Sequence, residues 1–156
     1  MMPLRRLLLK GSTAASLLPL LGGGVLLPTR VLAAEWNRNA FTARQTGDAQ
    51  KAYGAAQVTE SREITINTPE IAENGAKVEI EVTTTLAGAR SIAVFADKNP
   101  YPLCATMDFF PPAQPFVKLQ AKLAESTRIR ALVRSSDGKN YIAFRDVKVT
   151  LGGCGG

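Results

Sequence analysis

The sequence of 156 residues predicts a mainly β fold: an immunoglobulin-like antiparallel β-sandwich with a short N-terminal helix and a flexible C-terminal arm. Two observations predict this fold. Seven or eight short runs of alternating apolar and polar residues fill most of the chain after residue 60. Turn residues separate these runs and little helical pattern lies among them, which favours a sandwich over alternating β and α units. A small β-barrel is the second possibility.

Residues 1–33 have the composition of a cleaved export leader. They begin with basic residues, continue with an apolar middle and end with small residues. Pro19 and the glycines at 22–24 interrupt the apolar middle, so it is too short and broken for a membrane span, which needs about 20 residues. We expect cleavage after Ala33, with Ala34 as the near alternative, and no membrane association of the mature chain.

The start of the leader is similar to a twin-arginine export signal. Lys10 follows Arg5 and Arg6 at the expected offset, whereas Leu4 and Leu8 depart from the usual residues. A general secretory leader is the alternative. The twin-arginine route carries folded proteins, and a folded protein can take with it a partner that has no leader. The sequence therefore predicts a periplasmic protein.

The positive charge of the chain belongs mostly to this leader. The formal net charge is +6, of which the leader contributes +4 without containing an acidic residue. The remaining chain has 15 basic and 13 acidic residues, and hence a net charge of +2. Because it shows neither a clustered basic helix nor an aromatic RNA-binding motif, we expect no binding to nucleic acid.

Residues 34–54 are expected to form an N-terminal helical segment. Apolar residues between Trp36 and Tyr53 recur weakly at helical spacing, Gly47 interrupts them, and Gly54 follows at a plausible cap position. The pattern predicts one short helix, or two turns with a break, packed on the outside of the following domain.

Residues 55–151 are expected to form the β-sandwich domain. Val78, Ile80 and Val82 alternate with polar residues, as in a strand with one buried and one exposed face. Asp137 and Gly138 lie between two such runs and are the strongest hairpin signal in the chain. The other expected strands have the sequences REITINTP, SIAVFAD, PLCATMDFF, FVKLQAKL, TRIRALVR, KNYIAFRD and VKVTL.

The absence of histidine limits the chemistry that the chain can perform. It excludes a Ser-His-Asp or Cys-His nucleophile within this chain and removes the commonest metal ligand. Two cysteines alone are too few for a structural zinc site. We therefore expect no cofactor, no metal and no catalytic residue, and predict that the chain is not an enzyme on its own.

Cys104 lies within an expected strand, and three states are open to it. It can be a buried thiol that packs as a small apolar residue. In an oxidising compartment it can instead form a disulfide with another chain or with Cys154 of the same chain. An internal disulfide would immobilise the C-terminus.

Cys154 lies in the sequence "GGCGG" at the end of the chain, flanked by Gly152, Gly153, Gly155 and Gly156. Glycine has maximal backbone freedom, so we expect residues 152–156 to form a flexible arm. The three residues from Leu151 to Cys154 span about 10 Å when extended, enough to enter the pocket of another protein.

This placement suggests a covalent carrier, whose sulfur holds a substrate while separate enzymes act on it. Ordering the arm costs about 1–2 kcal/mol per residue, so each visit to an enzyme should be brief. A thiol with an ordinary pKa near 8.5 is only partly ionised at neutral pH, so activation is left to the partner. A frayed tail with an incidental cysteine is the alternative.

The terminal "VKVTLGGCGG", the preceding "DGKNYIAFRDVKVT", the twin-arginine-like leader and the order of helix and sandwich resemble the Y subunits of the sulfur-oxidising (Sox) carrier complexes, SoxY. The resemblance spans essentially the whole chain. It implies a two-layer, immunoglobulin-like sandwich that acts in the periplasm in thiosulfate oxidation. The match is loose at the N-terminal helix, and Cys104 is not part of the shared pattern.

The resemblance also implies partners. A leaderless Z subunit (SoxZ) would pair with the chain, and the proline-rich run 109–116 is a candidate contact. A haem-containing enzyme would join thiosulfate oxidatively to Cys154, giving a cysteine S-thiosulfonate. A manganese-dependent hydrolase would release sulfate, and a sulfane dehydrogenase would oxidise the sulfur left as a persulfide. These thiosulfate-derived species would stay attached to the carrier.

Two other kinds of function compete for the same features. Ubiquitin-like sulfur carriers also end in Gly-Gly, but they need ATP-dependent activation in the cytoplasm and a β-grasp fold around a central helix. A non-catalytic exported binding sandwich would explain the fold but not the terminal cysteine.

Overall fold

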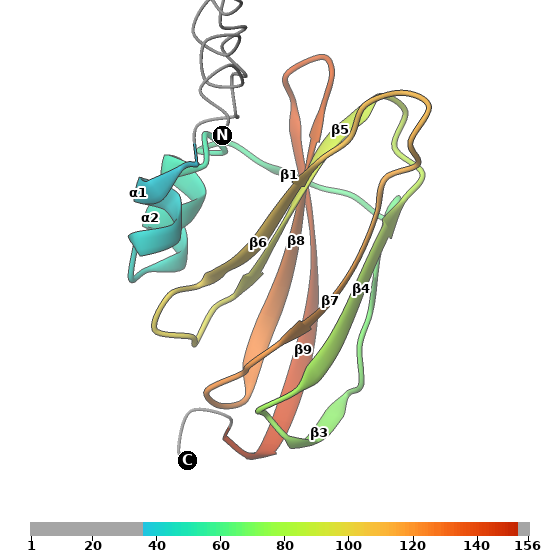
Figure 1. The fold of residues 1–156 in the computed structure, drawn as a ribbon. Helices are drawn as coiled ribbons and strands as arrows, with labels where there is room; N and C mark the ends of the chain where they lie inside the picture. The colour runs from blue at the N-terminus through green and yellow to red at the C-terminus, as the bar shows by residue number, and fades with distance from the viewer. Residues whose placement is uncertain (1–35, 153–156) are drawn as a thin grey trace, which may run out of the picture. The chain divides into compact units, whose positions relative to one another are not determined.

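The computed structural model describes residues 36–152 (Figure 1). The expected leader and the residues after Gly152 lie outside this range. The described helices and strands are α1 (Arg38–Thr42), α2 (Thr46–Ala52), β1 (Thr59–Glu60), β2 (Ile64–Asn67), β3 (Ile71–Asn74), β4 (Val78–Thr84), β5 (Ala89–Ala96), β6 (Leu103–Asp108), β7 (Phe116–Ala121), β8 (Thr127–Ser135) and β9 (Asn140–Leu151).

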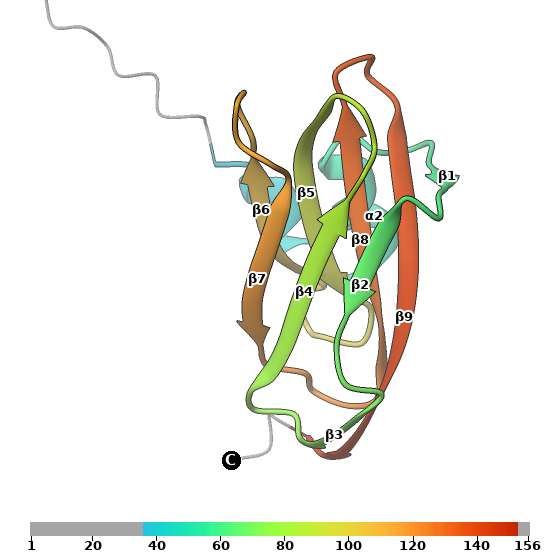
Figure 2. The same ribbon diagram turned by 90° about the vertical axis from the view of Figure 1, so that its right-hand side faces the viewer.

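Two β-sheets face each other and form a sandwich (Figure 2). The larger sheet has the order β6, β5, β8, β9, and all three pairings in it are antiparallel. The smaller sheet has the order β2, β4, β7 and is also antiparallel. The prediction of a mainly β, antiparallel sandwich with short N-terminal helices is therefore confirmed.

The edge of the larger sheet differs from the expectation. The runs KNYIAFRD and VKVTL form one continuous strand, β9, because no turn residue separates Asp146 from Val147. β1 pairs in parallel with the first part of β9, and β3 pairs in parallel with its last part. Two short segments that are distant in sequence thus cover the outer edge of the longest strand.

The main core lies between the two sheets. Ile80 and Val82 of β4 are fully buried, and they face Val94 of β5 with Ile129 and Val133 of β8. These side chains occupy every second position, so the period-two pattern of each strand directs one face into this core. Burial of apolar surface here is the principal stabilising contribution.

A second, smaller core lies on the opposite face of the larger sheet. Ala93 and Phe95 of β5 and Leu132 of β8 point away from the smaller sheet and pack against Ala40 of α1 and Ala49 of α2. Small alanine side chains let the short helices approach the sheet closely. β5 is consequently buried on both faces, which explains its nearly continuous apolar sequence.

The helical segment has the expected break, but at another position. The break lies between Thr42 and Thr46, whereas Gly47 lies inside α2. Gly54 follows α2 with a positive φ of 89°, as expected of a glycine after a helix. Within residues 36–152, no helix is long and apolar enough to cross a membrane.

The expected hairpin connects β8 to β9. Gly138 has a φ of 83°, a left-handed conformation that favours glycine. The Ser135 amide donates a hydrogen bond to the Lys139 carbonyl at 2.9 Å and closes the turn. The Asp137–Gly138 prediction is confirmed.

Replacing Phe95 by Ala should lower the free energy of unfolding by about 4 kcal/mol, because it removes the largest fully buried side chain between the sheet and the helices. Chemical denaturation of the purified domain measures this change. Ile71→Ala is the matched control, since Ile71 is 61% exposed and should cost little. Equal effects of the two substitutions would contradict the helix-covered core.

Candidate functional site

The end of β9 is the root of the predicted arm. β9 ends at Leu151, and Gly152 is the last residue that the structure describes. Gly153, Cys154, Gly155 and Gly156 lie outside the described residues. The structure therefore describes the root of the arm, the end of β9 with Gly152, and the residues that contact it.

β3 braces the root on one side. Asn74 lies opposite Leu151 in the parallel pairing of the two strands. The amide of Gly75 donates to the Leu151 carbonyl at 2.7 Å, and the Gly75 carbonyl accepts from the Leu123 amide at 2.7 Å. The Thr150 hydroxyl also donates to the Glu73 carbonyl at 2.7 Å. The last residues of β9 are thereby held by hydrogen bonds instead of fraying.

The loop between β7 and β8 braces the root on the other side. The amide of Val149 donates to the Ser126 hydroxyl at 2.9 Å. Asn99, in the loop between β5 and β6, joins this loop through both ends of its side-chain amide. Its Nδ2 donates to the Lys122 carbonyl at 2.7 Å, and its Oδ1 accepts from the Ala124 amide at 3.0 Å. One asparagine thus ties two loops together beside the root.

Gly152 is required by close packing. A Cβ atom built on Gly152 would lie 2.3 Å from the carbonyl oxygen of Ala124, far inside van der Waals contact. Because the obstacle is a backbone atom in a braced loop, it cannot turn aside as a flexible side chain would. Gly152 belongs to the packed end of the sandwich, although the sequence suggested that it is part of the flexible arm.

Charged side chains surround Phe144 on the face of β9 that carries Asp146. The guanidinium of Arg130 binds both carboxylate oxygens of Asp97, at 2.6 and 2.8 Å, and that of Arg128 binds Asp146 at 2.9 Å. Both guanidinium groups lie over the Phe144 ring, at 5.4 and 5.6 Å from its centroid. The hydrogen bond from Arg128 lowers the pKa of the Asp146 carboxyl. This cluster orders the strands leading to the root.

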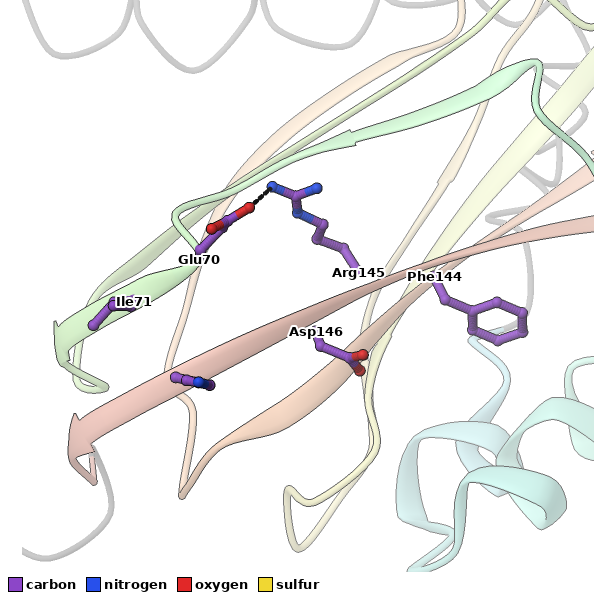
Figure 3. A pocket seen from close by; sticks show the side chains of 6 residues that line it. Glu70, Ile71, Phe144, Arg145 and Asp146 are labelled. Carbon is purple, nitrogen blue, oxygen red and sulfur yellow. Dashed lines mark hydrogen bonds and ion pairs between the residues drawn. The ribbon is translucent and has the colours of Figure 1, made fainter.

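An open depression lies across the edge of β9 (Figure 3). Arg145 points to one side of the strand, where it meets Glu70 at 3.0 Å, while Phe144 and Asp146 point to the other. The lining side chains are exposed and mostly charged. Small-molecule sites are usually enclosed and mostly apolar, so this depression does not have the character of a substrate pocket.

Cys104 is half-buried at a bulge in β6, and it has no disulfide partner among residues 36–152. Val94 pairs with Ala105 and Phe95 with Leu103, which leaves Cys104 as the extra residue. Its sulfur packs against the main core and lies 3.5 Å from the Pro102 carbonyl. Burial raises the pKa of the Cys104 thiol to about 11, although a hydrogen bond from the Ala96 backbone acts in the opposite direction. The disulfide alternatives stay open, since they involve Cys154 or another chain.

Among residues 36–152, no three His, Cys, Asp or Glu side chains come together as metal ligands would.

Sequence patterns do not identify the bracing residues. Asn99 is followed by a proline and Gly75 lies between two expected strands, and both features indicate only a turn. Neither signal reveals that these residues meet the end of β9, because the contacts join segments far apart in the chain.

Replacing Gly152 by Ala should lower the free energy of unfolding by about 1–2 kcal/mol, because either the Ala124 loop or the end of β9 must move. Denaturant unfolding and amide exchange of Val149 and Leu123 measure this effect. Gly155→Ala is the control and should leave both unchanged. Identical stability and exchange in the two variants would show that Gly152 is not packed as described.

Cys104 should react slowly with iodoacetamide in the native protein. With a thiol pKa of about 11, about one molecule in a thousand carries the thiolate at pH 8. The alkylation rate should rise about tenfold per pH unit until pH 11, and denaturation at pH 8 should remove the protection. Mass mapping in a Cys154→Ala background measures it. A native rate at pH 8 equal to the denatured rate would contradict a buried thiol.

Known proteins share this architecture. The family model described as sulfur oxidation protein SoxY matches residues 49–154. No curated protein sequence matches the chain. Among solved structures, the sulfur carrier protein SoxY from Chlorobium limicola f thiosulfatophilum is 39% identical, with a TM-score of 0.63, and the match covers 70% of this chain and 96% of that one.

A superoxide reductase (neelaredoxin) from Ignicoccus hospitalis is 20% identical, with a TM-score of 0.50, over 56% of this chain and 80% of its own. At this identity it shows a shared fold alone. The family match and the SoxY structure confirm the resemblance found in the C-terminal sequence. The chain belongs to the SoxY family of sulfur oxidation proteins.

Proposed function

We propose that this protein is a periplasmic carrier in thiosulfate oxidation and that Cys154 holds the sulfur compound covalently. The observation that carries the proposal is the position of Cys154. It is a glycine-flanked cysteine near the C-terminus of a SoxY-family chain, two residues beyond Gly152, which is packed against the braced β7–β8 loop. A fixed root followed by bare residues suits a thiol that must be presented to other proteins.

The proposed cycle needs no catalytic group on the carrier. A haem-containing enzyme would join the Cys154 thiol to thiosulfate through a new sulfur–sulfur bond. The thiol proton would leave to water, and the two electrons would pass one at a time through the enzyme's haem to an electron acceptor. Water, activated by a manganese-dependent hydrolase, then cleaves the terminal sulfonate as sulfate and leaves a persulfide on Cys154. A sulfane dehydrogenase would oxidise that remaining sulfur. Bond exchange at a thiol sulfur is the only chemistry required of this chain.

Cys104 supports the assignment by elimination. Its sulfur is half-buried, and burial raises the pKa of its thiol to about 11, so it is a poor nucleophile at neutral pH. Cys154 is the only other cysteine in the sequence. Loading should therefore be confined to one sulfur.

A leaderless Z subunit is the proposed permanent partner, exported with the folded chain by the twin-arginine route. Among the described strands, β6 and β7 each pair on one side only, and the connection between them carries exposed apolar side chains. Phe110 is 74% exposed and Phe116 47%, whereas Phe109 is buried in the core. The exposed Phe110 and Phe116, together with Met107 of β6, lie along the edge formed by β6 and β7. We propose this edge as the contact with the Z subunit.

The ubiquitin-like alternative is disfavoured by the fold. A β-grasp protein wraps one sheet around a helix, whereas this chain has two facing sheets with short helices on the outside. A purely structural binding sandwich predicts that truncation after Leu151 leaves function intact, and the carrier proposal predicts complete loss.

Cys154→Ala should fold normally and abolish thiosulfate oxidation in a reconstituted system, because no other sulfur can be loaded. Protein from cells oxidising thiosulfate should carry adducts on Cys154 that reductant removes, as intact-mass measurement would detect. Cys104→Ala is the matched control and should retain both turnover and adducts. Preserved turnover in Cys154→Ala, or only unmodified thiol in active cells, would refute the proposal.

A further inference from the structure

We propose that the end of the sandwich around Gly152 is a cationic docking surface for the enzymes that act on Cys154, and that those enzymes present an acidic rim around their active-site entrance. This inference rests on the proposed carrier function. We define the docking surface as the turn at 75–77, the β5–β6 loop at 97–101, the β7–β8 loop at 122–126 and Lys148.

The length of the arm makes contact at this surface unavoidable. Gly152 is packed against Ala124, and the preceding Leu151 is hydrogen-bonded to Gly75, so the chain is held in place as far as Gly152. Two residues then lead to Cys154 and span at most about 7 Å. An enzyme that takes the Cys154 sulfur into its active site must therefore approach this end of the sandwich to within contact distance.

The elements that form the surface lie together at this end. The turn after β3, the end of β7 and the end of β9 meet at the same end of the molecule in both ribbon views (Figures 1 and 2). The Gly75, Asn99 and Ser126 hydrogen bonds join the turn and the two loops to each other or to β9. The docking surface is thus a rigid platform, and binding does not have to order it.

The free charges of this surface are mostly positive. Lys77, Lys98, Lys122 and Lys148 are exposed, and none of them forms an ion pair within residues 36–152. The nearby carboxylates of Asp97 and Asp146 are already bound by arginines. Glu73 and Glu125 are the remaining exposed carboxylates nearby, so the four lysines outnumber them and the surface keeps a net positive charge.

An acidic rim is the partner chemistry that fits this surface. A carrier must meet several enzymes in turn and leave each one quickly, so its contacts should favour rapid association over long residence. Complementary charges at the edge of an interface raise the association rate more than the affinity. Exposed, hydrated lysines around a short arm are suited to that role.

The test uses the mature carrier in complex with its Z subunit and the enzyme that loads thiosulfate onto it. Lys98→Glu with Lys122→Glu should raise the KM for the carrier about tenfold at low ionic strength while kcat stays constant, and salt near 0.5 M should shrink the difference. The control is Lys51→Glu with Arg62→Glu, an equal change in charge at exposed positions in α2 and before β2. This control should leave KM within about twofold of wild type.

The outcomes separate this inference from the carrier function. Normal loading of all variants, or equal increases in KM for the two double variants, would overturn the docking surface and leave the carrier proposal standing. Absence of loading on wild-type Cys154 would overturn both. Iodoacetamide should alkylate Cys154 equally fast in every variant. A change there would show that the lysines act on the sulfur itself and not on a partner, and it would also overturn the inference.

Discussion

The backbone pairing of β9 is the constraint on which the rest of this structure depends. This strand pairs with β8 from Asn140 to Val147, and on its other edge with β1 and then, near its end, with β3. The pairing continues to the last residue, where the Leu151 carbonyl accepts a hydrogen bond from Gly75. Since the proposed carrier cysteine follows three residues later, the sheet holds the point from which the sulfur must operate.

Gly152 is packed at the end of the sandwich. It lacks a side chain where the Ala124 carbonyl occupies the space that a Cβ would need, and Gly153, Gly155 and Gly156 lie outside the described residues. The two cysteines differ in their position relative to the packed sandwich. Burial raises the pKa of the Cys104 thiol to about 11, and the other cysteine follows the end of the packed sandwich. The fold thus protects the Cys104 sulfur, and Cys154 is the proposed carrier.

The three layers leave two exposed surfaces of different character. The helices cover one part of the larger sheet through Phe95 and Leu132, and the smaller sheet covers the opposite face. The edge formed by β6 and β7 carries the exposed Phe110 and Phe116, and the end near Gly152 carries exposed lysines. An apolar edge suits the proposed lasting partner and a charged end suits the proposed brief encounters with enzymes, so the two proposed contacts would use separate surfaces.

The sequence by itself determined the strand pattern, the hairpin at Asp137 and Gly138, the lack of histidine chemistry and the glycine-flanked Cys154, because each depends on residues adjacent in the chain. Only the tertiary structure decided that β1 and β3 run parallel to β9, that Phe109 is buried while Phe110 is exposed, and that Gly152 is packed. It also decided that a bulge leaves the Cys104 thiol half-buried. The physical reason is that these features arise where distant segments meet. Alternation of apolar residues shows that a strand has a buried face, but not which segment covers it.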